Sequence, residues 1–174
     1  MNIAMAVRKR ADCLGNRVGA VIVKENRIVA TGYNGTPAGM PNCTEGGCHR
    51  CGNRAKYPTG TGYDMCICVH AEQNALLSAA RFGISVQGGA LYSTMQPCFG
   101  CFKEMLQAGI QSVCYLHSWI PSDTSREQYE TIQGFFSGGV RVVEMQDPEA
   151  SWAISRLREK TPVVQAVPDE IGHG

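Results

Sequence analysis

The sequence has no excess of charge of either sign, since 16 Lys and Arg residues balance 15 Asp and Glu residues and the formal net charge is +1. Duplex nucleic acid is bound through many basic contacts to phosphates, so this balance argues against a nucleic-acid partner. Charged residues are also few, at 18%, against 44% hydrophobic residues. That ratio excludes an intrinsically disordered chain and indicates one that can bury a core.

Long hydrophobic runs are absent as well. A membrane-spanning helix needs about 20 consecutive apolar residues, and no stretch approaches that length. The apolar run at 1–7 precedes the basic residues 8–10, the reverse of the order in a secretory signal. We therefore predict a cytoplasmic protein with no membrane partner. Repeats and linkers are also lacking, so we expect a single domain over residues 1–160, followed by a flexible C-terminal tail at 161–174.

The sequence does contain two short motifs with metal-binding chemistry. His-Ala-Glu at 70–72 is followed downstream by Pro-Cys-Phe-Gly-Cys at 97–101. One imidazole and two thiolates give Zn²⁺ three protein ligands and leave its fourth position open, while the glutamate is free to move protons. This spacing is a known signature of zinc-dependent nucleobase deaminases. We predict a catalytic zinc held by His70, Cys98 and Cys101, with Glu72 as the catalytic proton-transfer group.

Each motif alone has an ordinary explanation. A single C-x-x-C can be a redox pair, and a histidine before a helix is more often a cap or a packed side chain than a ligand. The two motifs support each other because both are predicted to lie at helix starts. Apolar residues recur at helical spacing from 71 to 80 and again from 102 to 108, after a short strand at 90–94. Two helix N-termini directed at one metal would favour thiolate over thiol.

The remaining pattern alternates between strands and helices. Strands separated by helices imply a sheet covered on both faces, and the helix between the last two strands makes those strands parallel. The predicted class is α/β with a mixed five-stranded sheet. Besides the segments above, we expect a helix at about 3–11, a hairpin of strands 18–23 and 28–33 turning at 25–26, a strand at 111–117, a helix at 125–136, a strand at 140–144 and a helical stretch at 147–158.

Nine cysteines are a high and odd number for a chain of 174 residues. In the cytoplasm such a density points to metal rather than to disulfides. Cys114 lies in an apolar run and is expected to be buried. Five of the six others lie in an insertion, residues 35–68, and the sixth, Cys13, lies upstream of it. The insertion has no apolar periodicity and would need a second, closed zinc to hold it together. The candidate ligands are Cys13, Cys43, Cys48, Cys51, Cys66 and Cys68, with His49 among them. Because a closed zinc takes four ligands, at least two of these candidates must be left over.

Four segments together resemble the deoxycytidylate (dCMP) deaminases, including bacterial forms known as late-competence operon proteins. The resemblance covers about residues 3–145 in the family's order. The zinc motifs are common to the cytidine deaminase superfamily, whereas the Gly-Tyr-Asn-Gly loop at 32–35 narrows the resemblance to the dCMP enzymes. It implies a three-layer α/β/α cytidine deaminase-like fold. The segments are Val18–Ile22, Gly32–Gly39, Val69–Ala75 and Pro97–Cys101.

The resemblance also implies a reaction and residue roles. The reaction would be hydrolysis of dCMP to dUMP and ammonia, which serves dTTP supply, with Glu72 moving protons from water to the ring N3 and to the departing ammonia. Ala71, Gln96 and Pro97 would contact the base as substrate-binding residues. Asn34 would contact the sugar or the ring.

Similar enzymes are homohexamers that dCTP activates and dTTP inhibits, with Mg²⁺ accompanying the triphosphate. Some of them also hold a structural zinc. Their effector site corresponds here to Gly32, Tyr33, Asn34, Gly35 and Arg81, and their structural-zinc cysteines correspond to Cys13, Cys43, Cys48 and Cys66. Cys51 and Cys68 are additional to that pattern.

Two other functions stay open. On the same fold, the substrate could be cytosine, a nucleoside such as cytidine, guanine or a pterin-like precursor. In a different class, the segment Cys48-His49-Arg50-Cys51 could form a zinc knuckle for single-stranded nucleic acid, although interleaved aromatic residues and net basic charge are lacking. Replacing Glu72 by alanine discriminates these classes, because only an enzyme loses turnover.

Overall fold

The computed structural model describes residues 1–57, 61–119 and 122–158. In these ranges the chain forms a five-stranded sheet in the order β2-β1-β3-β4-β5. β1 pairs antiparallel with β2 and β3, whereas the β3–β4 and β4–β5 pairs are parallel. The predicted mixed sheet, with its last two strands parallel, is confirmed. The strands are β1 (Gly19–Lys24), β2 (Arg27–Tyr33), β3 (Ala90–Met95), β4 (Ser112–His117) and β5 (Val140–Val142).

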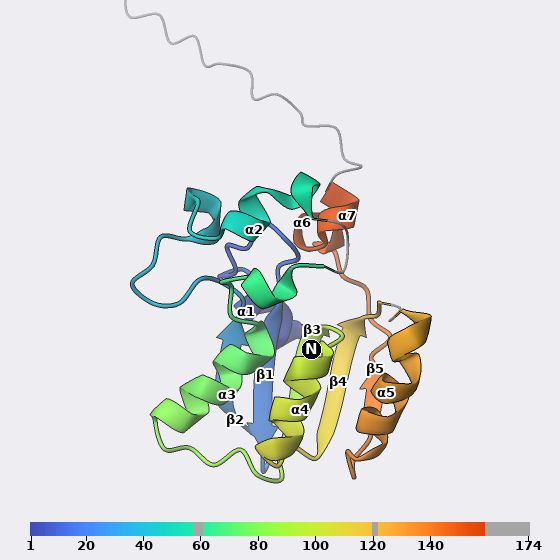
Figure 1. Ribbon diagram of the computed structural model, residues 1–174. Coiled ribbons are helices and arrows are strands. Elements are labelled where there is room, and N and C mark those ends of the chain that lie inside the picture. The colour runs from blue at the N-terminus through green and yellow to red at the C-terminus, as the bar shows by residue number, and fades with distance from the viewer. Residues whose placement is uncertain (58–60, 120–121, 159–174) are drawn as a thin grey trace, which may run out of the picture.

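Helices cover both faces of the sheet (Figure 1). Two glycines allow the close approach. An added Cβ at Gly19 would lie 2.2 Å from the carbonyl oxygen of Ala4 in α1, and one at Gly32 would lie 2.1 Å from that of Ala71 in α3. Gly32 pairs with Ala20, the neighbour of Gly19, so the two contacts are on opposite faces. The predicted three-layer α/β/α fold is confirmed. The helices are α1 (Asn2–Arg8) on one face and α3 (Ala71–Arg81), α4 (Phe99–Gln107) and α5 (Asp123–Gly134) on the other.

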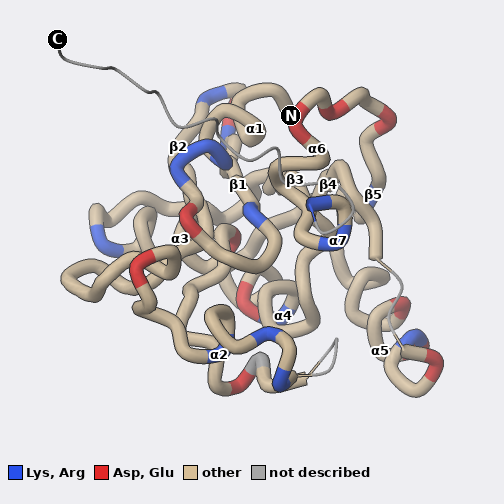
Figure 2. The backbone as a smooth tube through the Cα atoms, turned by 90° about the horizontal axis from the view of Figure 1, so that it is seen from above, with Lys and Arg blue, Asp and Glu red and all other residues tan. Residues whose placement is uncertain are grey.

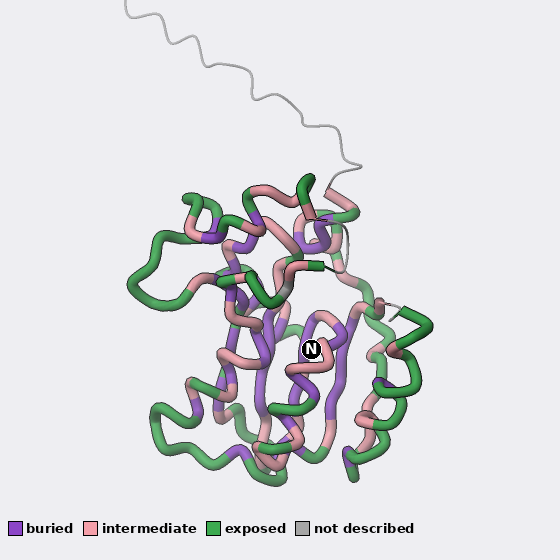
Figure 3. The backbone as a smooth tube through the Cα atoms, viewed as in Figure 1, coloured by how far each residue is buried: buried purple, intermediate pink, exposed green. Residues whose placement is uncertain are grey.

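The main hydrophobic core lies between the sheet and the layer of α3, α4 and α5. In Figure 3, buried residues follow the strands and exposed residues follow the outer turns of the helices. Ile22, Leu91 and Val113 from the strands and Phe102 and Met105 from α4 are all 0% exposed. Burial of each such side chain contributes about 1.5–3 kcal/mol. This packing fixes where α3 and α4 begin relative to the sheet.

The prediction of one continuous helical stretch at 147–158 is wrong. The structure has two one-turn helices, α6 (Ala150–Ala153) and α7 (Ser155–Arg158), separated by the extended and buried Ile154. The backbone N–H and hydroxyl of Ser155 both donate to Asn16 Oδ1 at 3.0 Å, so contacts to the N-terminal loop interrupt the helix. The predicted tail at 161–174 lies outside the described residues.

In its described residues, 34–57 and 61–70, the segment between β2 and α3 contains only short turns. They are a 3₁₀ turn at Cys43–Glu45, α2 (His49–Gly52), and 3₁₀ turns at Arg54–Lys56 and Tyr63–Met65. A single antiparallel bridge between Gly35 and Val69 joins the ends of the insertion. A second cluster of buried residues, separate from the main core, joins the insertion to the loop before β1. It consists of Cys13, Cys43, Cys48, Cys51 and Cys68, with Leu14 and Cys66 packed against it.

Basic and acidic residues are distributed around all sides of the described chain (Figure 2). This agrees with the balanced composition. Among the described residues, no helix combines the length and the apolar character needed to cross a membrane.

Candidate active site and thiol cluster

The two predicted zinc motifs lie at neighbouring helix N-termini. His70 is the N-cap residue of α3 and Cys98 is the N-cap residue of α4, so each lies directly before the first turn of its helix. The backbone N–H of His70 donates to Gln73 Oε1 at 3.0 Å, which completes a capping box and fixes the start of α3. Cys101 follows in the first turn of α4, on the same side as Cys98.

The three predicted ligands converge. His70 Nδ1 lies 3.4 Å from Cys98 Sγ and 3.4 Å from Cys101 Sγ, and the two sulfur atoms are 3.6 Å apart. The bonds of tetrahedral zinc are about 2.3 Å to sulfur and about 2.0–2.1 Å to nitrogen. Two sulfur ligands of one ion therefore lie about 3.8 Å apart, and a sulfur and a nitrogen ligand lie about 3.6 Å apart. These three groups therefore have the donor chemistry and spacing for a zinc ion that keeps one open position.

The two thiols compete for ionisation. The hydrogen bond with Cys101, helped by His70, lowers the pKa of Cys98 to about 4. The same Cys98 hydrogen bond, together with burial, raises the pKa of Cys101. Contact with Cys98 raises the pKa of His70 to about 9. A cation bound between these groups would remove the competition, because it stabilises both thiolates and neutral imidazole.

Glu72 is buried beside this group of ligands, with 3% of its surface exposed. Its Oε1 accepts a 2.6 Å hydrogen bond from the Ser93 hydroxyl, and its Oε2 lies 3.7 Å from Cys101 Sγ. Burial raises the pKa of the Glu72 carboxyl, although His70 and Ser93 oppose the shift. Because its pKa is raised, this buried carboxyl group takes up a proton more readily than an exposed glutamate does, which suits it to general acid–base catalysis.

Sequence reasoning missed the residues that support this arrangement. Ser93 is fully buried on the same face of β3 as Leu91, and strict alternation along β3 could have indicated a hydroxyl that faces the core. The Tyr129 hydroxyl in α5 accepts the Phe99 N–H at 2.8 Å and so holds the start of α4. Tyr129 lies 30 residues further along the chain, so no local pattern relates the two.

The predicted substrate residues occupy fixed positions near the centre. Ala71 and Pro97 are fully buried, and the Gln96 side chain accepts the backbone N–H of Trp119 at 3.3 Å. Asn34 is also buried. Its Oδ1 accepts the Val18 N–H at 2.7 Å and its Nδ2 donates to the Asn16 carbonyl at 2.8 Å, so both ends of the amide hold the loop before β1.

The predicted effector residues do not gather at one place in a single chain. Tyr33 and Gly35 line a cavity of about 210 Å³ together with Arg10 and Asp12. Gly32 instead packs against the backbone of α3. Arg81 is exposed at the last residue of α3, about 15 Å along the helix axis from its first residue.

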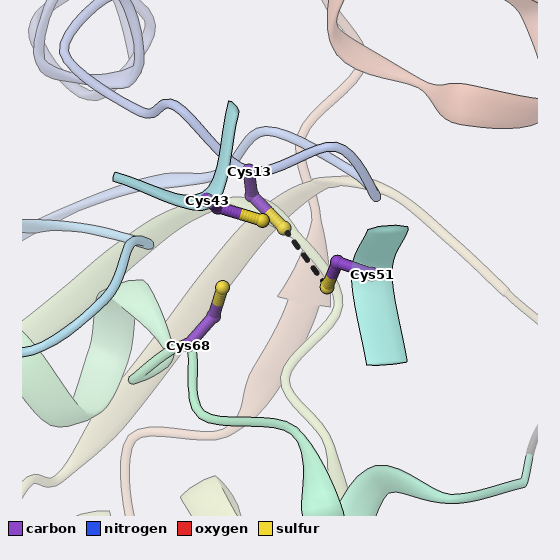
Figure 4. Close-up of side chains that lie close together, drawn as sticks. All are labelled: Cys13, Cys43, Cys51 and Cys68. Atoms are coloured by element: carbon purple, nitrogen blue, oxygen red, sulfur yellow. Dashed lines mark hydrogen bonds between the residues drawn. The ribbon is translucent and has the colours of Figure 1, made fainter. Parts of the chain in front are cut away.

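The six cysteines of the insertion and the preceding loop form a thiol cluster with two overlapping groups of four. In each group, all four sulfur atoms lie within 4.8 Å of one another. The four cysteines expected from the resemblance are divided between the groups. The exposed His49 belongs to neither, and its Nδ1 contacts Asn53 Nδ2 at 3.3 Å. The groups are Cys13, Cys43, Cys51 and Cys68 (Figure 4), and Cys48, Cys51, Cys66 and Cys68.

Comparison with known proteins identifies the family. Residues 1–117 match the family described as the cytidine and deoxycytidylate deaminase zinc-binding region. A deoxycytidylate deaminase of Schizosaccharomyces pombe is 44% identical over 119 residues, which cover 68% of this chain and 36% of that protein. A deoxycytidylate deaminase of Mycobacterium phage D29 is 39% identical over 121 residues, which cover 66% of this chain and 89% of the phage protein.

A solved structure is similar in fold and in sequence. The dCMP deaminase of cyanophage S-TIM5, in complex with dCMP and dUMP, matches with a TM-score of 0.61 and 29% identity, covering 82% of this chain and 92% of the phage chain. The chain spans about a third of the length of the yeast relatives, at 36% of each. Together with the geometry of His70, Cys98 and Cys101, these matches establish that the chain belongs to the cytidine and deoxycytidylate deaminase family, as the sequence motifs predicted.

Proposed function

We propose that this protein catalyses the hydrolytic deamination of dCMP to dUMP and ammonia. The observation that carries the proposal is the buried Glu72 carboxylate, 3.7 Å from Cys101 Sγ, beside a His-Cys-Cys group suited to zinc. The preference for a deoxynucleotide rests on the relatives, which are named deoxycytidylate deaminases, and on the cyanophage enzyme, which was solved with dCMP and dUMP.

In this proposal His70, Cys98 and Cys101 hold the catalytic zinc. Bound there, zinc would supply the Lewis acidity that brings the pKa of water to about 7. Glu72 accepts a proton from the attacking water, delivers it to the ring N3, and passes a second proton to the departing amine. The Ser93 hydroxyl engages Oε1, which leaves Oε2 facing the ligand group, so the carboxyl keeps one orientation through both transfers.

The proposal assigns recognition of the base to Ala71, Gln96 and Pro97. Their positions support this role, because Ala71 directly follows His70, and Gln96 and Pro97 directly precede Cys98, so all three lie on the rigid helix starts beside the ligand group. The Trp119 ring N–H also donates to the Gln96 carbonyl at 2.9 Å, which fixes the strand end before α4. For Asn34, the proposed contact to the sugar uses the second N–H or the second lone pair of its amide, since the first of each is already engaged.

We further propose that dCTP activates and dTTP inhibits the enzyme, with Mg²⁺ on the triphosphate, in a cytoplasmic homohexamer. The cavity lined by Tyr33, Gly35 and Arg10 supports an effector site at the Gly-Tyr-Asn-Gly loop. Arg81 lies at the far end of α3 from that loop, so in this proposal it reaches the effector from a neighbouring subunit. Size-exclusion chromatography with light scattering, with and without dCTP, tests the assembly.

The substrate assignment is tested by measuring ammonia release from dCMP, CMP, deoxycytidine, dCTP and guanine, each with and without dCTP or dTTP. We expect dCMP to be preferred. Equal turnover of deoxycytidine would contradict the nucleotide assignment, and preference for guanine would favour the other deaminases of this fold. If the protein releases no ammonia from any of these substrates but binds single-stranded nucleic acid, the result would favour the alternative function, a zinc knuckle that binds nucleic acid.

A further inference from the structure

The two groups in the thiol cluster share two members. Cys51 and Cys68 belong to both groups of four, whereas each of the other cysteines belongs to one group only. Figure 4 shows the first group, in which the sulfur atoms of Cys13, Cys43, Cys51 and Cys68 point toward a common space from four separate segments. The arrangement is thus two overlapping groups of four, and not a site of four with two bystanders.

The spacing within the cluster matches that of a metal tetrathiolate. Sulfur atoms bound to one tetrahedral zinc lie about 3.8 Å apart, given a bond of about 2.3 Å. In this cluster the separations are 3.9 Å for Cys13 and Cys51, 3.9 Å for Cys48 and Cys66, and 3.7 Å for Cys51 and Cys66. All nine cysteines are free, so no disulfide explains the convergence.

We propose that the thiol cluster binds two zinc ions that share two bridging thiolates, a Zn₂Cys₆ site. Two tetrahedral ions need eight sulfur contacts, and six cysteines supply them when two cysteines contact both ions. Cys51 and Cys68 are the bridges. Cys13 and Cys43 complete one ion, and Cys48 and Cys66 complete the other.

Two segments of the chain each supply one ligand of the second ion and one bridging ligand. α2 and its N-cap provide Cys48 for one ion and Cys51 as a bridge, while the C-x-C segment before α3 provides Cys66 for the same ion and Cys68 as the second bridge. A single zinc would use four thiols and leave the remaining pair beside the site. With two ions, every cysteine of the cluster has a role.

The surroundings of the cluster favour metal over simple hydrophobic packing. Apart from cysteines, Leu14 is the one partly buried hydrophobic residue of the described chain that packs against this cluster, so little apolar surface holds the insertion. Two backbone N–H groups already point at sulfur: Leu14 N lies 3.4 Å from Cys43 Sγ, and Gly15 N lies 3.3 Å from Cys13 Sγ. Such donors stabilise thiolates in metal sites.

The site would also connect the insertion to the catalytic helix. Cys68 lies two residues before His70, and Cys13 follows α1, which packs against the opposite face of the sheet. Two ions would therefore tie the N-terminal loop, the insertion and the start of α3 into one unit. This inference does not depend on which base the enzyme deaminates, because it rests on cysteines outside the proposed active site.

The first test is the zinc content of the full-length protein, expressed with added zinc, freed of loosely bound metal and measured by mass spectrometry. We expect about three zinc ions per chain, one catalytic and two in the cluster. The Cys98→Ser variant should hold about two. The matched control is Cys114→Ser, which removes a buried cysteine of β4 outside both groups and should keep all three. Two ions in the wild type and one in Cys98→Ser would overturn the proposal.

The second test detects the bridges directly. In protein reconstituted with ¹¹³Cd, we expect two cluster resonances that are split by coupling through the shared thiolates, and a third, unsplit resonance that Cys98→Ser removes. Cys48→Ser should abolish the splitting. If that variant fails to fold, zinc–zinc scattering in the X-ray absorption spectrum of the wild type decides the question. Uncoupled resonances, or an absorption spectrum without zinc–zinc scattering, would rule out the bridged site.

Discussion

The proposed active site and the thiol cluster both bring cysteines together, but different forces hold them. His70, Cys98 and Cys101 lie at the starts of α3 and α4, and these helices pack against the sheet through fully buried residues such as Phe102 and Met105. The thiol cluster lies on short turns, and apart from cysteines Leu14 is the one hydrophobic residue of the described chain that packs against it. One arrangement is positioned by a hydrophobic core, and the other has little besides its own sulfur atoms.

This difference separates two uses of metal. A site built on packed helices keeps its geometry without the ion, so its zinc serves chemistry and keeps an open position. A site built on turns depends on the ion for its structure, and binding energy becomes folding energy. Removing metal should therefore have opposite consequences in the two regions.

The largest effect is expected on metal removal. During slow treatment with a chelator, activity should disappear first, because a zinc with an open position exchanges more readily than one enclosed by four thiolates. Protease resistance of the segment 36–57 should be lost later, with the last zinc, while the sheet stays folded. Activity, zinc release and cleavage are followed in the same time course. Simultaneous loss of all three signals would contradict the distinction between the regions.

Single substitutions should separate the regions further. Cys98→Ser should lower turnover by about a thousandfold or more while the insertion stays resistant to protease, because a proposed ligand of the catalytic zinc is lost and the cluster is not. Cys48→Ser should have the reverse pattern, with cleavage in the insertion and measurable turnover. Limited proteolysis and ammonia release are measured on both variants. Cys114→Ser controls for loss of any buried thiol and should resemble the wild type in both assays.

The sequence predicted those features that local patterns determine. The hairpin turn at Glu25 and Asn26 is present, with φ of 52° and 59°, because a two-residue turn between alternating strands requires positive φ. The proposed zinc ligands and Glu72 could be predicted because each motif occupies the start of one helix. The partition of the thiol cluster was not, since Cys13, Cys51 and Cys68 come from separate segments and their order in the chain does not encode which sulfur atoms meet.

Ion pairs between residues far apart in the chain could not be predicted from the sequence either. Arg8 is 0% exposed, and its guanidinium donates to both oxygens of Asp147 at 2.7 and 2.8 Å, across 139 residues of chain. His117 contacts the same carboxylate at 2.7 Å. In the sequence, Arg8 is one of three consecutive basic residues at the end of an apolar run, which gives no sign of a buried partner.

This ion pair provides a test of the core-built region alone. Asp147→Asn should destabilise the protein by about 3–5 kcal/mol, because it removes the buried charge partner of Arg8 and leaves only the more distant, partly exposed Glu149. Unfolding in urea, followed by circular dichroism, measures the change. Glu149→Gln is the matched control: Glu149 also approaches Arg8, at 3.5 Å, but its side chain is 35% exposed, and we expect less than about 1 kcal/mol. Equal effects would refute the role of burial.

The same pair makes a signed prediction for pH. The guanidinium of Arg8, helped by His117, holds the pKa of Asp147 well below its usual range. Its contribution to stability is therefore complete above the unfolded pKa of about 3.9, and it is lost as the pH falls from there toward the folded pKa. Between about pH 5 and about pH 3, the free energy of unfolding should fall further in the wild type than in Asp147→Asn. Parallel curves would contradict the assignment.

The smallest effect is expected at Ser93. Ser93→Ala should lower turnover by about tenfold, because the carboxylate of Glu72 loses one charge-assisted hydrogen bond. The Ser93 hydroxyl lowers the pKa of Glu72, so its removal should raise that pKa and move the acidic limb of the kcat/KM profile to higher pH. A lower rate with an unchanged pH profile would mean that Ser93 has a packing role only.

The most direct test of the proposed chemistry is ammonia release from dCMP by Glu72→Gln, compared with the wild type and with Glu130→Gln at the same zinc content. Glu130 is an exposed glutamate of α5, and its substitution controls for loss of a carboxylate. We predict that Glu72→Gln keeps its zinc and its fold but loses turnover by at least about 10²–10⁴-fold, while Glu130→Gln retains full activity. Undiminished turnover in zinc-loaded Glu72→Gln would contradict the account.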